Sequence, residues 1–331
     1  MIRSPICEMF GTAYPIWLAG MGGVSMAPLV AAISNAGGLG VIGAATLSPE
    51  GLRREIRKTR ELTDKPFAVD LLAPIPDMIR PHMQVVFEET IEVFVAGLAV
   101  PREFIAEMHS RGMKVVVMTG KVSHALRAEE AGADAVVAQG TEAGGHTGEI
   151  GALALVPQVV DAVKIPVLAA GGIVDGRGLV AALALGAQGV VIGTRFIASE
   201  EATAAPSYQQ AIVRAGDDST VRTRCYTGKP ARTIRNPYVA ELEREPSKIR
   251  SFPHQAVYSS QQGVMDYVGR GGGCDPQRTF MPAGQGSGAI HDVRPAAEIF
   301  RSIVEEAERI VEEKFRSVGS SKRGAAAPAR A

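Results

Sequence analysis

The region around residues 136–199 constrains the fold most, because three short apolar runs there each end in a glycine-rich loop. The apolar runs are Ala135–Ala138, Ile165–Ala170 and Gly189–Ile192. Helix-like segments, Leu155–Val163 and Gly178–Leu185, lie between them. Strand, loop and helix in regular alternation are typical of a parallel sheet whose functional loops follow the carboxyl ends of the strands.

The same alternation starts near the N-terminus and predicts five earlier strands. These are Pro15–Gly20, Gly40–Gly43, Pro66–Leu72, Ile91–Ala96 and Lys114–Met118. The expected helices are Ala27–Asn35, a helix capped by Ser48, Pro81–Glu89 with Pro81 at its first position, Arg102–Ser110 and Ser123–Ala131. Eight strand-and-helix units predict an α/β fold of the (β/α)8 TIM-barrel type, because a doubly wound sheet usually has fewer strands.

The alternation ends near residue 216, so residues 1–216 are the predicted barrel core. Residues 217–286 are polar and irregular, and we expect a mostly helical and loop-built lid over the barrel mouth, inserted after strand eight. Its apolar content is too low to predict a core of its own. Residues 287–316 contain Ala296, Ile299 and Ile303 at helical spacing and predict a helix that packs back on the barrel. The low-complexity tail, 317–331, is expected to be disordered.

Composition narrows the class of partner. The 35 basic and 35 acidic residues balance, so no net charge favours nucleic acid or an anionic membrane. Cys7, Cys225 and Cys274 are widely spaced and predict reduced thiols, neither a disulfide framework nor a metal site. With no signal peptide and no membrane-spanning run evident, we expect a cytoplasmic protein that takes a small-molecule substrate.

Two glycine-containing loops follow strands seven and eight and suggest a phosphate site. They are Gly171-Gly172 and Gly193-Thr194. In a barrel this pair of loops commonly binds phosphate, because glycine lets backbone N–H groups approach the anion and a helix N-terminus follows. The alternative is that the glycines only permit tight turns. Asp175, just beyond, is predicted to cap the next helix.

His146 stands in a glycine-rich loop after strand six, where its side chain is a candidate general base, acid or hydrogen-bond donor. A histidine bonded only within its own loop is the alternative. No metal-binding motif accompanies it, and we expect no metal. The GxGxxG match at Gly38–Gly43 follows a helix and brackets a strand, which argues against a Rossmann dinucleotide site.

Four motifs together make the chain resemble the nitronate monooxygenase family, once called 2-nitropropane dioxygenases. They are EAGGHTG at 142–148, PVLAAGGIVDGRG at 166–178, LGAQGVVIGTRF at 185–196 and PAGQGSG at 282–288. The segments AGM at 19–21 and NAGGLGVIG at 35–43 fit the same family. The resemblance covers most of residues 10–312 and extends to related flavin-dependent enoyl-reductases and quinone reductases.

The resemblance implies an FMN-binding barrel with His146 as the active-site residue. The residues it places at the cofactor are Ala19, Gly20, Met21, Asp70, Gln139, Gly144, Gly145, Gly171, Gly172, Gly193, Thr194, Gly286 and Ser287. A homodimer is one assembly compatible with this family.

The chain departs from the family pattern at three places beside the expected flavin ring. Leu18-Ala19 stands where the family commonly has Gln-Gly, Asp70 where asparagine is frequent, and Met118 where a polar or basic residue is frequent. These changes reduce polar contact with the ring, and we expect them to affect flavin potential or substrate choice.

Three function classes follow. The first is FMN-dependent oxidation of alkyl nitronates by O2 to a carbonyl compound and nitrite, in which His146 orients the anion or deprotonates the neutral nitroalkane. The alternative is an NAD(P)H-dependent FMN reductase of an enoyl thioester or quinone. The basic residues between Arg222 and Arg235 are then candidate contacts for a nucleotide or CoA phosphate, although a solvated charged surface is the favoured interpretation of them. A non-catalytic barrel that binds a phosphorylated ligand is the third class.

Overall fold

The computed structural model describes residues 2–73, 76–269 and 273–315, and their core is a barrel of parallel strands. The strands are β1 (Ile16–Leu18), β2 (Gly40–Gly43), β3 (Phe67–Leu72), β4 (Val93–Gly97), β5 (Lys114–Thr119), β6 (Ala135–Gln139), β8 (Val167–Ala170) and β9 (Gly189–Ile192). Their order is β1-β9-β8-β6-β5-β4-β3-β2, and a parallel bridge from Trp17 to Leu39 joins the two ends. Each predicted strand has its counterpart, and the TIM-barrel prediction is confirmed.

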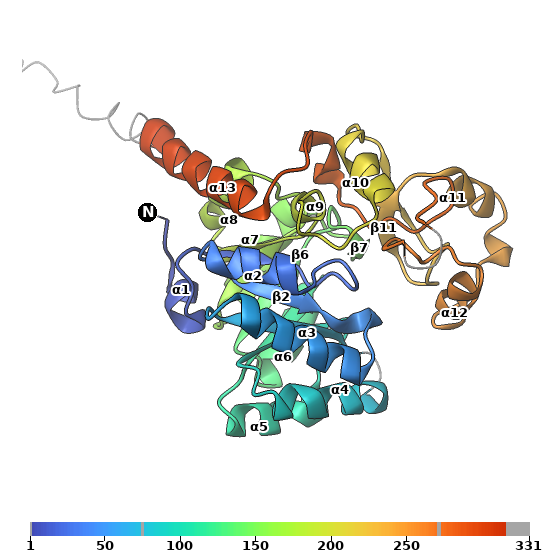
Figure 1. The fold of residues 1–331 in the computed structure, drawn as a ribbon. Helices are drawn as coiled ribbons and strands as arrows, with labels where there is room; N and C mark the ends of the chain where they lie inside the picture. The colour runs from blue at the N-terminus through green and yellow to red at the C-terminus, as the bar shows by residue number, and fades with distance from the viewer. Residues whose placement is uncertain (1, 74–75, 270–272, 316–331) are drawn as a thin grey trace, which may run out of the picture.

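Helices surround this barrel (Figure 1). They are α2 (Ala27–Asn35), α3 (Pro49–Leu62), α4 (Pro76–Glu88), α5 (Arg102–Ser110), α6 (Val122–Glu130), α7 (Ala152–Ala162), α8 (Gly176–Ala184) and the short α9 (Thr194–Ile197). Ser48 accepts from the Gly51 N–H and Asp175 from the Gly178 N–H, so both predicted caps are present. The α4 prediction was wrong at its start: the helix begins at Pro76 and Pro81 lies inside it, where its missing N–H removes one backbone hydrogen bond.

The amino end of the barrel is closed by apolar side chains. Helix α1 (Pro5–Phe10) places Ile6, Cys7 and Phe10 in one buried cluster with the inward-facing residues of the strands. The ring of Phe10 meets the ring of Trp17 edge to face, with centroids 4.7 Å apart. Because this end is packed, open space inside the barrel is left only toward the carboxyl ends of the strands.

Residues 217–286 contain strands that the sequence reading missed. β10 (Thr220–Thr223) and β11 (Ala231–Ile234) form an antiparallel pair, and β11 also pairs with β7 (Gly145–His146). These residues bury a small cluster of their own around Tyr226, contrary to the expectation of no core. Helices α11 (Pro237–Leu242) and α12 (His254–Gln261) complete the segment, which lies on one side of the barrel in Figure 1. We call residues 217–286 the lid.

Two further helices connect the lid to the barrel. α10 (Pro206–Val213) precedes the lid, and α13 (Ala296–Ile310) packs against α8 and α2 (Figure 1). A π-helical turn, Val311–Phe315, extends α13. The expected disordered tail lies outside the described residues. No helix in the described part of the chain is long and apolar enough to cross a membrane.

Candidate active site

A cavity of about 470 Å³ opens at the carboxyl ends of the barrel strands, with the lid forming part of its wall. All of the site residues predicted from sequence line it, except Ser287. The residues that line it are Ala19, Gly20, Met21, Asp70, Gln139, Gly144, Gly145, His146, Gly171, Gly172, Gly193, Thr194 and Gly286. Ser287 is fully buried behind them, and its hydroxyl donates to the Gly284 carbonyl at 2.7 Å, which holds the loop that contains Gly286.

The two loops after β8 and β9 present unpaired backbone donors to this cavity. Within the described residues, the N–H groups of Gly171, Gly172, Gly193 and Thr194 have no protein acceptor. Gly171 and Gly172 have φ values of 101° and 73°, a conformation that strongly favours glycine. Unpaired N–H groups on adjacent strand-end loops form the kind of concave surface that binds a phosphate.

The loop from the C-terminal region is tied to the same place. The Gly284 N–H donates to Thr194 Oγ1 at 3.0 Å, and the Gln285 N–H donates to the Glu142 carbonyl at 2.8 Å. A Cβ atom at position 284 would lie 2.6 Å from that carbonyl, so this approach requires glycine. The PAGQGSG segment therefore packs directly against the loops that present these unpaired donors.

His146 lies on β7, at the boundary between barrel and lid. Gln139 Nε2 donates to the His146 carbonyl at 3.2 Å, and the imidazole Nε2 is 3.0 Å from Thr227 Oγ1 in the lid. Burial lowers the pKa of His146 to about 4, and the positive charge of Lys229 acts in the same direction. The imidazole is therefore neutral at pH 7 and can accept a proton.

Asp70 extends from β3 into the same cavity. Burial without an ion-pair partner in the described residues raises its pKa to about 8, so the carboxyl is protonated at neutral pH. Gly20 packs directly on it, since a Cβ atom at position 20 would fall 2.2 Å from Asp70 Oδ2. The carboxyl is thus a neutral group that can donate a hydrogen bond.

Cationic side chains are absent from the described wall of the cavity. Of the described residues, no lysine or arginine lines it, and Met118 stands near the end of β5. Two arginines of the lid are used elsewhere: Arg232 Nε donates to the Thr141 carbonyl and Arg222 Nη1 to the Gly148 carbonyl, both at 2.9 Å. Those contacts hold the loop on either side of His146. At pH 7 the titratable groups Asp70 and His146 are both neutral.

Comparison with known proteins decides the family. The sequence profile of the nitronate monooxygenase family matches residues 3–306. The chain belongs to the nitronate monooxygenase family. This makes it an oxidoreductase, and it confirms the resemblance seen in the sequence motifs.

Relatives in this family carry more than one activity name. The chain is 42% identical to a (3aS,4S,5R,7aS)-5-hydroxy-7a-methyl-1-oxo-octahydro-1H-indene-4-carboxyl-CoA dehydrogenase of Rhodococcus jostii, over 73% of this chain and 68% of that protein. FabK from Thermotoga maritima superposes with a TM-score of 0.88 at 37% identity, over 96% of this chain and 100% of that chain. Nitroalkane oxidase from Streptomyces ansochromogenes gives 0.84 at 31% identity, covering 95% and 99%.

Seven lid residues at the cavity are among those that sequence reasoning missed. They are Thr227, Phe252, Ala256, Met265, Tyr267, Phe280 and Pro282. The aromatic and methionine side chains within an otherwise polar segment are the one sequence signal that could have indicated them. The Tyr267 hydroxyl donates to the Gly22 carbonyl at 2.8 Å and so joins the lid to the loop after β1.

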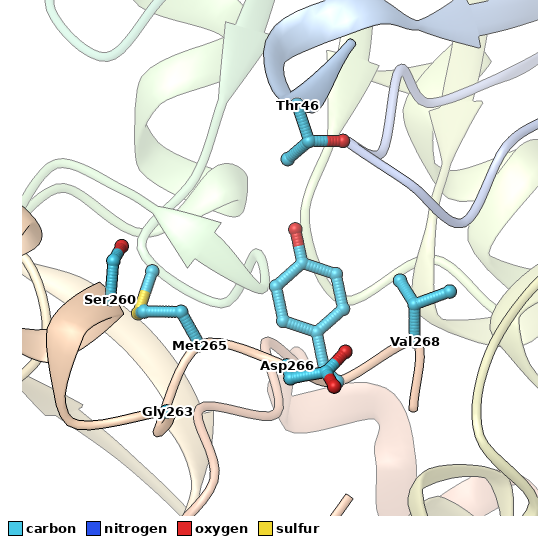
Figure 2. A pocket seen from close by; sticks show the side chains of 7 residues that line it. Thr46, Ser260, Gly263, Met265, Asp266 and Val268 are labelled. Carbon is cyan, nitrogen blue, oxygen red and sulfur yellow. The ribbon is translucent and has the colours of Figure 1, made fainter. Parts of the chain in front are cut away.

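A second, shallower pocket of about 240 Å³ lies outside the cavity and shares Thr46, Met265 and Tyr267 with it. Figure 2 shows Thr46, which follows β2, facing Met265, Asp266 and Val268 of the lid across this pocket. The shared residues therefore form the boundary between the two spaces.

Proposed function

We propose that the protein is an FMN-dependent oxidoreductase that oxidises alkyl nitronates, or the nitroalkanes from which they form, with O2 to a carbonyl compound and nitrite. The observation that carries this proposal is a neutral, proton-accepting histidine in a cavity that also offers a set of unpaired backbone donors suited to a phosphate. Family membership adds the reaction class.

The residues present fit FMN. The phosphate would take the unpaired N–H groups of the loops after β8 and β9, and the neutral Asp70 carboxyl would donate to a polar edge of the ring. Ala19, Gly20 and Met21 leave backbone exposed beside the space for the ring. When bound, FMN would accept electrons from the substrate and pass them to O2.

His146 supplies the proton chemistry. No described side chain at the cavity is cationic, so a substrate is best accommodated as the neutral nitroalkane, and the neutral imidazole then accepts the proton from its α-carbon. The imidazolium formed lies beside the new nitronate anion, and this opposite charge offsets the burial that keeps the pKa low in the free site. The same contact orients a nitronate that arrives already ionised.

Oxygen uptake tests the proposal. Purified protein loaded with FMN is expected to be yellow and to consume O2 with propyl nitronate and with 1-nitropropane, releasing nitrite. The measurement is O2-electrode turnover combined with nitrite assay. Protein that binds FMN but releases no nitrite with either form of the substrate would contradict nitronate oxidation and leave the cofactor assignment standing.

The phosphate loop gives a separate prediction. Gly171→Ala is expected to weaken FMN binding by at least about tenfold, because alanine is strained at φ 101° and its Cβ would lie 3.1 Å from the Gly140 oxygen. Gly112→Ala, at another positive-φ position with nothing within 4 Å, controls for backbone strain alone. Fluorescence titration of the flavin-free proteins measures both. Equal affinities in the two variants would place the phosphate elsewhere.

A neutral thioester is the second candidate substrate, and the absence of lysine and arginine from the described cavity wall favours it. The similarity to a carboxyl-CoA dehydrogenase and to FabK supports the same class. Anaerobic mixing of the FMN protein with NADH, NADPH and a nitronate in turn separates the candidates. Rapid bleaching by a pyridine nucleotide, with none by the nitronate, would select the NAD(P)H-dependent reductase.

A further inference from the structure

The hydroxyl of Thr227 contacts the imidazole of His146, and its neighbouring polar groups determine the direction of each of its hydrogen bonds. The hydroxyl lies in the loop between β10 and β11 and is buried. Three polar groups surround Oγ1: His146 Nε2 at 3.0 Å, the Lys229 carbonyl at 3.1 Å and the Lys229 N–H at 3.3 Å. A threonine hydroxyl has one proton to donate and two lone pairs that accept.

Only one assignment of protons satisfies all three contacts. The Lys229 N–H can only donate and the Lys229 carbonyl can only accept, so the hydroxyl proton goes to the carbonyl. Oγ1 must then accept from His146 Nε2, which places the imidazole proton on Nε2. With the proton on Nδ1 instead, the hydroxyl would have to donate to Nε2 and the contact to the Lys229 carbonyl would be lost.

The other ring nitrogen is available to a ligand. Nδ1 has no hydrogen-bond partner in the described part of the chain. It is also not fully buried, so solvent or a ligand can reach it. His146 itself lines the cavity. An imidazole protonated on Nε2 therefore presents the lone pair of Nδ1 to whatever occupies that space.

We propose that Thr227 is a positioning residue that holds His146 in the Nε2–H tautomer, so that Nδ1 is the atom that accepts the substrate proton. This deepens the proposed function and rests on it for the identity of the substrate. In the step, the α-carbon–hydrogen bond breaks, the proton forms a bond to Nδ1, and the electron pair stays on the substrate as the nitronate or enolate anion. The same tautomer leaves Nδ1 without an N–H to offer a substrate carbonyl, so it favours proton abstraction over carbonyl polarisation.

Nitrogen NMR of the wild-type protein tests the tautomer without any turnover. Long-range 1H–15N correlation of histidine-labelled protein at pH 7 is expected to show His146 as the neutral Nε2–H form. The signal is assigned by its absence from His146→Ala. A wild-type signal of the Nδ1–H form would overturn the proposal.

Variants at the hydroxyl test the cause. Thr227→Val keeps the shape and removes the hydroxyl, and we expect a mixture of both tautomers, with kcat reduced about 3- to 10-fold, the range of one net hydrogen bond, and KM changed less than about twofold. Thr227→Ser is expected to restore the tautomer and kcat. Thr233→Val, which removes another buried lid hydroxyl bonded to the Met281 carbonyl, should leave the His146 signal in the Nε2–H form.

The outcomes separate the two proposals. An unchanged tautomer in a folded Thr227→Val overturns the role of Thr227, whatever the substrate. If Thr227→Val does not fold, the wild-type and Thr227→Ser spectra decide, because Thr227→Ser must show the same Nε2–H form. Absence of nitrite with every nitroalkane, together with the expected tautomer, contradicts nitronate oxidation only and leaves the positioning role intact.

Discussion

Replacing His146 with alanine is expected to reduce nitroalkane oxidation by about 10²- to 10⁴-fold, the range of a positioned general base. This side chain is the proposed proton acceptor, and no other histidine of the described chain lines the cavity. FMN content should be unchanged, because the N–H groups proposed to hold its phosphate belong to the loops after β8 and β9. Turnover measured at saturating nitroalkane, alongside flavin absorbance, checks both statements. His124→Ala, an exposed histidine of α6, is the matched control.

The pH dependence of the wild-type enzyme follows from the same residue. A base with a lowered pKa is active above that pKa and loses activity as it becomes protonated. With the pKa of His146 at about 4, kcat/KM for a neutral nitroalkane should stay level from pH 7 down to about pH 5.5 and fall only toward pH 4. Half-loss near about pH 6.5 would show an imidazole with ordinary solvation, contrary to its burial beside Lys229.

If His146→Ala keeps full turnover with the neutral nitroalkane, the assignment of the base is wrong. Full turnover with the preformed nitronate alone has a different meaning. It would show that His146 removes the proton but is not needed afterwards, because an ionised substrate has no α-proton left to transfer.

Replacing Asp70 with asparagine is expected to stabilise the flavin-free protein, and increasingly so as the pH rises. The folded-state pKa of about 8 lies above that of the unfolded carboxyl, so the native state holds the proton more tightly. The wild-type protein therefore loses stability as the pH rises. This loss begins above about pH 4 and is complete above about pH 8. The full pKa shift corresponds to a free energy on the order of 5 kcal/mol, and water in the open cavity reduces this value. We therefore expect Asp70→Asn to raise the free energy of unfolding by about 2 to 5 kcal/mol at pH 9.

Urea unfolding at pH 4.5 and pH 9 measures that gain. The Asp70→Asn substitution should raise the free energy of unfolding at pH 9 and have little effect at pH 4.5. Asp161→Asn, at an exposed position of α7, is the control and should give no pH-dependent difference. Equal effects of Asp70→Asn at both pH values would mean that the carboxyl is hydrated enough to ionise normally.

The barrel was predictable because each strand is an apolar run closed by glycine or a helix cap, and those signals are local. Ser48 and Asp175 sit where their side chains accept from the first turn of a helix, so the sequence alone places them. The cavity residues of the barrel followed from the same rule, since strand ends of a parallel barrel converge.

The lid could not be predicted in the same way. β10 reads TVRT and β11 reads ARTI, and neither four-residue run has an apolar pattern that stands out. Their stability comes from pairing with each other and with β7, which is a tertiary contact between segments far apart in the sequence. Thr227 was missed for the same reason, because its role depends on a hairpin loop that brings it to His146.

The pairing of β7 with β11 couples the position of His146 to the lid. His146 belongs to the barrel by sequence, yet its backbone is held in register by a strand of the lid. A lid of different length or sequence would therefore change the direction of the imidazole as well as the shape of the wall facing it. The lid therefore affects both the substrate that the cavity accepts and the position of the reactive nitrogen. If the lid of a relative replaced this one, we expect both properties to change together or neither to change.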